Sequence, residues 1–123
     1  MPLEKKPNKL ESKKSFYKTI ENHYKPIVND KIPKSILSDL CLYLARSLHK
    51  SYKILRKKHP KSKDRYSTFK TKDLQYPFTQ YIITDFLKEK DAVNYRSYSK
   101  IIFQMTENEF KDYEKQKHAY ETK

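Results

Sequence analysis

Apolar side chains recur along much of this chain at intervals of three or four residues, the spacing of an amphipathic helix. The longest such pattern begins at Lys34 and stops ahead of Pro60. Its apolar positions are Ile36, Leu37, Leu40, Cys41, Leu44, Leu48, Tyr52 and Leu55. Because they form one stripe over several turns, and basic residues 56–58 suit the negative end of a helix dipole, the pattern predicts a long central helix.

Shorter patterns flank the central helix. Residues 15–24 predict a first helix that Pro26 limits, followed by a loop of turn residues. A third stripe follows Thr71, which is a suitable N-cap, and Pro77 predicts a kink there or a later helix start. From residue 85 a final helical pattern runs onward and becomes more charged, so we expect fraying past Thr106. The fold class is therefore all-α.

Length and composition limit the number of domains and the size of the core that the chain can form. Its 123 residues have room for one domain, and only 36% are hydrophobic, so we expect a partner to supply part of the core. The lysines and prolines of residues 1–14 predict a disordered basic tail. Cys41 lies on the apolar stripe and is expected to be a buried thiol, which leaves no disulfide within the chain.

Charge narrows the class of partner. The formal net charge is +13 and the sequence pI is near 9.7, a signature of nucleic-acid binding, with an anionic membrane as the other polyanion to consider. No apolar stretch approaches the roughly 20 residues that span a bilayer, and no apolar segment follows the charged N-terminus. We therefore expect a soluble, intracellular protein without a membrane anchor.

One segment resembles a known family. Residues 67–75 read Ser-Thr-Phe-Lys-Thr-Lys-Asp-Leu-Gln, which is similar to Ser-Thr-Ile-Thr-Ser-Arg-Glu-Ile-Gln at the second loop and third helix of core histones of the 2B type. Upstream, Phe16, Tyr17, Pro26 and Ile32 match the first helix and first loop of that family, and the resemblance spans residues 13–105. Glycine-free loops and an added stretch at 106–123 suggest a divergent or viral version rather than a standard eukaryotic one.

The resemblance implies a histone fold over residues 15–84, in which a short, a long and a short helix are followed by an additional C-terminal helix at 85–105. It implies a chain that pairs with a histone 2A-like partner, docks on a histone 3 and 4 assembly and packages double-stranded DNA. The nucleus and its chromatin, or a virion, would then be its location. No catalysis, cofactor or metal is expected.

The resemblance also assigns residues. The DNA contacts it implies, to phosphates and the minor groove without sequence reading, are Lys13, Lys14, Lys31, Ile32, Lys34, Ser35, Arg65, Ser67 and Thr68. The partner interface it implies consists of Leu37, Leu40, Leu44, Leu48, Tyr81 and Asp85. The family has a minor-groove arginine immediately before Ser-Thr, and here that place is Tyr66, with Arg65 one residue earlier.

Two alternatives stay open. A small basic ribonuclease toxin would use histidines for acid–base work, and the chain offers His23, His49, His59 and His118, although none stands at a recognisable spacing from a carboxylate or an arginine. A non-histone helical protein that binds DNA as a homodimer is the other. Tyrosines at helical spacing are expected to pack rather than to stack on bases.

Overall fold

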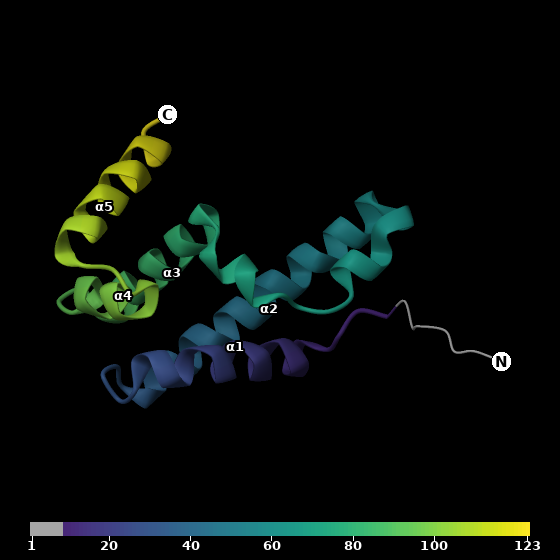
Figure 1. Cartoon of the computed structure of the whole chain (residues 1–123), viewed down its shortest axis with the longest axis horizontal. Coiled ribbons are helices and arrows are strands. Elements are labelled where there is room, and N and C mark those ends of the chain that lie inside the picture. The colour runs from purple at the N-terminus through teal and green to yellow at the C-terminus, as the bar shows by residue number, and fades with distance from the viewer. Residues whose placement is uncertain (1–8) are drawn as a thin grey trace.

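A computed structural model of the chain describes residues 9–123. These residues form only helices and connecting segments, so the all-α expectation is confirmed for the described part of the chain. The α-helices are α1 (Lys13–Val28), α2 (Lys34–Lys58), α3 (Pro77–Lys90), α4 (Tyr95–Phe103) and α5 (Glu107–Glu121). Helices α1 and α2 lie side by side, α3 and α4 gather at one end of the molecule, and α5 extends beyond them (Figure 1).

The first helix is longer than the sequence predicts. Ser12 caps it by accepting a hydrogen bond from the Ser15 N–H at 3.1 Å, so Lys13 and Lys14 belong to the helix rather than to a tail. The helix continues through Pro26 to Val28, and our expected end near residue 24 is wrong. Val28 is 2% exposed, so burial of its side chain offsets the backbone hydrogen bond that proline cannot donate.

Polar residues make the turns that glycine makes in most proteins. Asn29 and Asp30 follow α1 with φ angles of 43° and 68°, and Gln104 ends α4 with a φ of 56°. Asn and Asp enter this left-handed region more readily than other residues with a Cβ, because their short polar side chains bond locally. A chain without glycine can therefore still reverse its direction directly after a helix.

Two short 3-10 helices, η1 (Pro60–Tyr66) and η2 (Thr71–Gln75), connect α2 to α3. Thr71 is the first residue of η2, so the predicted N-cap role is wrong. Helix α3 begins at Pro77, which confirms the later start, because proline at the first helical position needs no hydrogen-bonded N–H. This connection returns along α2 and places α3 against the first half of α2, where the Tyr43 and Phe86 rings stack with centroids 4.9 Å apart.

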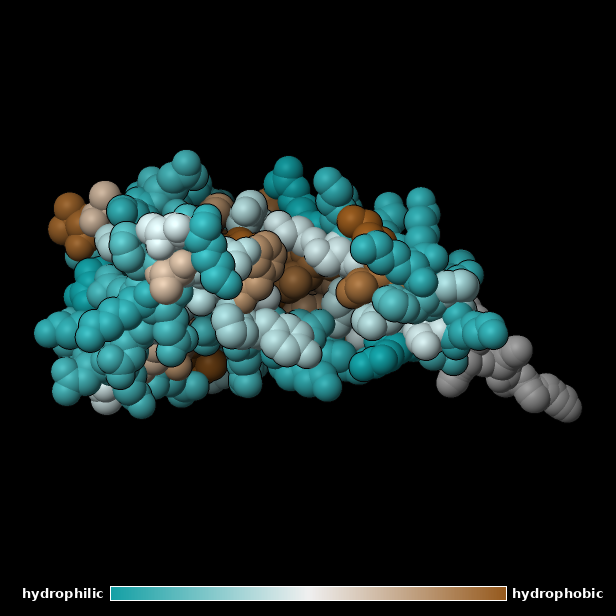
Figure 2. Space-filling view, turned by 90° about the horizontal axis from the view of Figure 1, so that it is seen from above, coloured by the Kyte–Doolittle hydropathy of each residue, from teal (hydrophilic) through white to brown (hydrophobic). Residues whose placement is uncertain are grey.

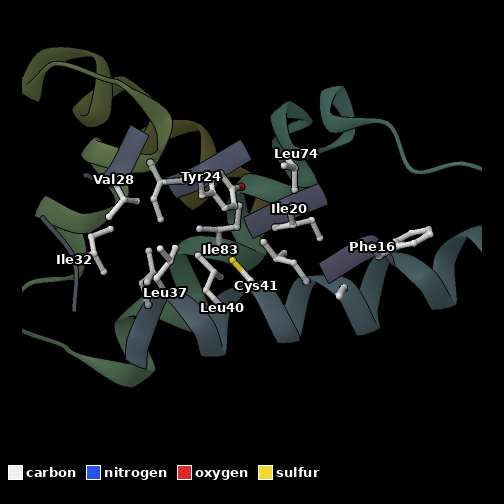
Figure 3. Packing of buried hydrophobic residues seen from close by; sticks show 14 of the residues in the cluster. Phe16, Ile20, Tyr24, Val28, Ile32, Leu37, Leu40, Cys41, Leu74 and Ile83 are labelled. Atoms are coloured by element: carbon white, nitrogen blue, oxygen red, sulfur yellow. The ribbon is translucent and has the colours of Figure 1, made fainter. Parts of the chain in front are cut away.

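The core lies between α1, α2 and α3. Helix α1 contributes four side chains spaced four residues apart, which face the apolar stripe of α2, and Ile83 of α3 closes the cluster (Figure 3). The fully covered members include Phe16, Ile20, Leu40, Cys41, Leu44, Ile83 and Leu87. The stripe of α2 is thus largely covered by helices of its own chain. The expectation that a partner completes the core stays a prediction. Burial also raises the pKa of the Cys41 thiol to about 12, consistent with an inert thiol.

The C-terminal third differs from the single helical pattern that we predicted. The chain breaks at residues 91–94, where the Asp91 carboxylate accepts hydrogen bonds from the Val93 and Asn94 N–H groups. Past Thr106 it does not fray but forms α5, which begins with a capping box: Thr106 Oγ1 accepts from the Glu109 N–H, and Glu109 Oε1 accepts from the Thr106 N–H. Residues 106–123 are therefore largely helical.

Ion pairs hold α5 against α4. The Arg96 guanidinium donates to Glu107 at 2.9 Å and to Glu114 at 3.0 Å, and Lys100 Nζ lies 2.8 Å from Glu107. Hydrogen bonds from Arg96, and then from Lys100, lower the pKa of Glu107 to about 2. Tyr113 adds an anchor to α3, because its hydroxyl lies 2.6 Å from Thr84 Oγ1 and donates to the Gln80 carbonyl at 2.9 Å.

Glu107 is expected to contribute to the acid sensitivity of the protein. Because folding lowers its pKa from 4.5 to about 2, the contribution of Glu107 to stability is complete above about pH 4.5 and is lost as the pH falls through 2. Arg96→Gln removes the main cause, so urea midpoints measured between pH 7 and pH 2 should fall less with acid than in the wild type. Lys111→Gln, an exposed change on α5, is the control and should keep the wild-type slope. Equal acid dependence in both variants would contradict this role.

Candidate nucleic-acid interface

Basic side chains crowd one end of the molecule. Residues 50–72, which run from the second half of α2 through η1 to η2, hold ten lysines and arginines against one acidic residue, Asp64. The ten are Lys50, Lys53, Arg56, Lys57, Lys58, Lys61, Lys63, Arg65, Lys70 and Lys72, and we call them the basic end. All but Arg56, which is half-buried, are exposed. Hydrophilic side chains make up most of this part of the face seen in Figure 2, with a few apolar ones among them, and a recessed apolar area lies nearer the middle.

The basic end keeps its charge uncompensated. None of its nine exposed cations forms an ion pair with any residue in the range 9–123. Cations of α3 to α5 behave differently: Lys90 lies 3.2 Å from Asp39, and Lys117 lies 2.8 Å from Asp85. Residues 77–123 hold eight lysines and arginines and eight acidic residues, so their charges balance, whereas the basic end has a large excess of positive charge that favours contact with a polyanion there.

A pocket of about 250 Å³ opens within the basic end. Its lining consists of Tyr52, Leu55, Arg65, Tyr66, Lys70, Lys72, Asp73 and Tyr76, and we call it the tyrosine pocket. Tyr76 is 56% exposed and Tyr66 is half-buried, so aromatic rings and cations are presented together. The Arg65 guanidinium lies over the Tyr66 ring, 5.7 Å from its centroid.

Tyr52 fixes the inner wall of the tyrosine pocket. Its hydroxyl donates to Asp73 Oδ2 at 2.5 Å and accepts from the Lys70 N–H at 3.0 Å. Burial raises the pKa of Tyr52, and the hydrogen bond to the Asp73 carboxylate raises it further. The neutral phenol therefore ties α2 to the segment between η1 and α3, which holds the shape of the pocket without a bound ligand.

The predicted DNA-contact residues of the second loop differ in whether solvent can reach them. Arg65 is exposed at the tyrosine pocket, as a phosphate contact requires, and Thr68 is also exposed but does not line the pocket. Ser67 instead turns inward: it is 8% exposed, accepts from Arg56 Nη1 at 2.8 Å and donates to the Lys63 carbonyl at 2.9 Å. The Ser67 hydroxyl therefore stabilises the turn after α2 in this conformation, rather than facing solvent where a phosphate could reach it.

The other predicted DNA contacts lie on two further surfaces. Lys13 and Lys14 are exposed at the start of α1 and line a groove of about 500 Å³ together with Arg46. Lys31, Lys34 and Ser35 are exposed at the opposite end of α2, about 37 Å from its C-terminus for a helix of 25 residues, whereas Ile32 is buried in the core. One chain thus does not bring the predicted first-loop and second-loop contacts together.

The predicted partner-interface residues pack within the chain. Leu37, Leu40 and Leu44 are buried in the core, and the partly buried Leu48 packs against it. On α3, the Tyr81 ring lies near Tyr113 and Tyr120 of α5, with centroids 5.8 Å and 5.1 Å away, and Asp85 forms its ion pair with Lys117. Helices α1, α3 and α5 cover these positions because the chain folds back after α1, after α2 and after α4.

Several residues of the candidate interface were missing from the sequence prediction. Lys57, Lys61, Lys70, Lys72 and Tyr76 were not assigned to DNA contact, although the density of basic residues over 50–72 was visible in the sequence. Tyr76 could not be found from spacing, because its exposure depends on the bend between η2 and α3, which turns its side chain out of the core.

Other kinds of site have less support in the structure. Within residues 9–123 no group of three or more His, Cys, Asp or Glu residues could hold a metal ion. His23 lies on α1, His49 on α2, His59 directly after α2 and His118 on α5. His49 Nε2 lies 2.9 Å from the Glu11 carbonyl oxygen, a contact that ties the N-terminal segment to α2. No helix among the described residues is long and apolar enough to cross a membrane.

No protein-family model, curated protein or solved structure matches this chain.

Removing the Tyr52 hydroxyl should loosen the connection between α2 and α3. Tyr52→Phe leaves the Asp73 carboxylate and the Lys70 N–H without this partner, and a hydrogen bond to a charged group contributes about 1.5–3 kcal/mol, so we expect a loss of about 2 kcal/mol in the free energy of unfolding. Urea titration followed by circular dichroism measures it. Tyr66→Phe is the matched control, because the Tyr66 hydroxyl has no hydrogen bond among the described residues. Equal stability of the two variants would contradict the proposed tie.

Proposed function

We propose that this chain binds nucleic acid without reading its sequence, through phosphate contacts made by the basic end. The observation that carries the proposal is the group of nine exposed cations that form no ion pair among the described residues. Lysine and arginine side chains of this kind release condensed counterions when they neutralise phosphates, and this release supplies most of the affinity in sequence-independent binding.

The aromatic rings within the basic end favour nucleic acid over an anionic membrane. Tyr66 and Tyr76 are interleaved with Arg65, Lys70 and Lys72 around one pocket. This combination of ring faces with cations is typical of surfaces that bind nucleic acid without sequence preference, because every base has a face that can stack. A membrane surface would need apolar side chains along the same edge, and the basic end has one prominent example, Ile54, at 47% exposure.

Neutralising part of the basic end tests the proposal. Lys57→Gln with Lys61→Gln should weaken binding to a labelled 20-base-pair duplex roughly tenfold or more at about 0.1 M salt, and should lower the slope of log affinity against log salt by up to about 1.8. Fluorescence anisotropy over a salt series measures both quantities.

A matched pair of changes on α5 serves as the control. Lys111→Gln with Lys115→Gln removes the same net charge from exposed positions away from the basic end, and it should reduce affinity much less. Equal losses from the two double variants would show that net charge alone, rather than the basic end, attracts the nucleic acid. Binding that does not respond to salt would contradict phosphate contacts altogether.

A narrower form of the proposal is a histone 2B-like subunit that pairs with a histone 2A-like chain, docks on a histone 3 and 4 assembly and packages double-stranded DNA in chromatin or a virion. Its support is the resemblance over residues 67–75 and the order of α1, α2, α3 and α4, a short, a long and a short helix followed by a C-terminal helix. The burial of Leu40 and Leu44 beneath α1 and α3 counts against it, because pairing would require the stripe of α2 to face the partner.

Measurements on the chain with and without a histone 2A-like partner distinguish general nucleic-acid binding from the histone proposal. Alone, the chain should size as a monomer and unfold cooperatively in urea, because α1 and α3 already cover the α2 stripe. After mixing with a histone 2A-like chain in high salt, a 1:1 complex with a raised urea midpoint would support the histone form. Two separate species with unchanged midpoints would contradict pairing and leave nucleic-acid binding by the basic end standing.

A further inference from the structure

The phosphate contacts of the basic end do not explain why it contains a pocket lined by tyrosines. Its volume of about 250 Å³ lies below the roughly 300–1,000 Å³ of sites that enclose a whole small molecule. A space of this size suits one part of a longer ligand. Its position in the middle of the basic end indicates that the ligand is the same polyanion that the surrounding cations attract.

We propose that the tyrosine pocket takes up one unpaired nucleotide of a bound strand, with the base stacked on Tyr76 and the neighbouring phosphates on Arg65 and Lys72. The inference deepens the proposed function and rests on it. Bases within a duplex are covered on both faces by their neighbours, so stacking on a side chain requires a base outside the helical stack. The pocket therefore distinguishes single-stranded segments, bulges and ends from continuous duplex.

The rings of the pocket are placed for this role. Tyr76 is 56% exposed, and the bend between η2 and α3 carries it past the core that buries Leu74 two residues earlier. Tyr66 also lines the pocket, and its ring centroid lies 6.0 Å from that of Tyr52 at an interplanar angle of 82°. The Tyr66 ring therefore forms a fixed wall of the pocket, and the exposed Tyr76 ring is the one left open to a base.

The charges of the pocket suit a nucleotide. Arg65, Lys70 and Lys72 supply three cations, and Asp73 is the one acidic residue in the lining. The Asp73 carboxylate accepts the Tyr52 hydroxyl at 2.5 Å and so belongs to the wall rather than to a free anionic site. Three cations against one engaged carboxylate leave the mouth of the pocket positive, which favours phosphates on either side of a stacked base.

Removing the ring of Tyr76 tests the inference. Tyr76→Leu should weaken binding to a labelled 20-nucleotide single strand roughly tenfold, because one base–aromatic stack is lost, while affinity for the 20-base-pair duplex changes less than about twofold. Tyr76→Phe keeps the ring and should bind as the wild type does. Tyr120→Leu removes an exposed tyrosine of α5, 51% exposed, and should change neither affinity. Circular dichroism and urea midpoints confirm that each variant is folded.

The failure of this inference can be told from the failure of the proposed function. If Lys57→Gln with Lys61→Gln weakens both ligands while Tyr76→Leu weakens neither, the basic end binds nucleic acid and the assignment of the pocket is overturned. The assignment is also overturned if Tyr76→Leu weakens single strand and duplex equally. If the lysine changes weaken neither ligand, the proposed function fails, whatever Tyr76→Leu does.

Discussion

The packing of Phe16 is the contact on which the rest of the structure depends. Its ring is fully buried, and its centroid lies 5.1 Å from those of His49, Tyr52 and Phe69. These partners belong to α2 and to the segment after η1, so one side chain of α1 joins the three parts of the chain that must meet. Such clustered rings bury large apolar areas and prefer edge-to-face geometry, which fixes orientation as well as proximity. From this junction the connection after α2 runs back along the helix, and α3 packs against the core.

The junction also relates folding to the candidate interface. The Glu11 N–H donates to the Ser67 carbonyl, and the Phe69 N–H donates to the Glu11 carboxylate, so the segment ahead of α1 is paired with the loop that borders the basic end. The same loop holds Tyr66 and Lys70 at the tyrosine pocket. Mutual repulsion among the exposed cations of residues 50–72 opposes folding. The buried aromatic contacts and the backbone hydrogen bonds offset that repulsion, which allows a concentrated positive surface to sit on a small domain.

Much of the helical plan could be predicted from the sequence, and the rest depended on tertiary contacts. The stripe from Ile36 to Leu55 and the proline at 60 defined α2 closely, because an amphipathic pattern and a terminal proline are local signals. The extension of α1 past Pro26 was missed, since it is stabilised by the burial of Val28 in a core that the pattern does not reveal. Helix α5 was predicted only as the fraying end of one long helical pattern, although its Thr106 and Glu109 form a capping box that marks a separate helix start in the sequence. The basic end was visible as charge density, whereas the inward turn of Ser67 and the exposure of Tyr76 were not.

Residues 50–72 hold ten basic residues and one acidic residue, whereas residues 77–123 hold eight of each, and this uneven distribution makes the protein an electric dipole as well as a net cation. Such a molecule turns as it approaches a polyanion, and its positive pole arrives first. Molecules that dock by one pole point away from the strand instead of lying along it. The length of strand that each molecule covers is therefore set by the width of the basic end rather than by the length of the molecule. The ion-paired surface of α4 and α5 then faces outward, and a strand covered in this way presents to its surroundings a layer of largely neutralised charge.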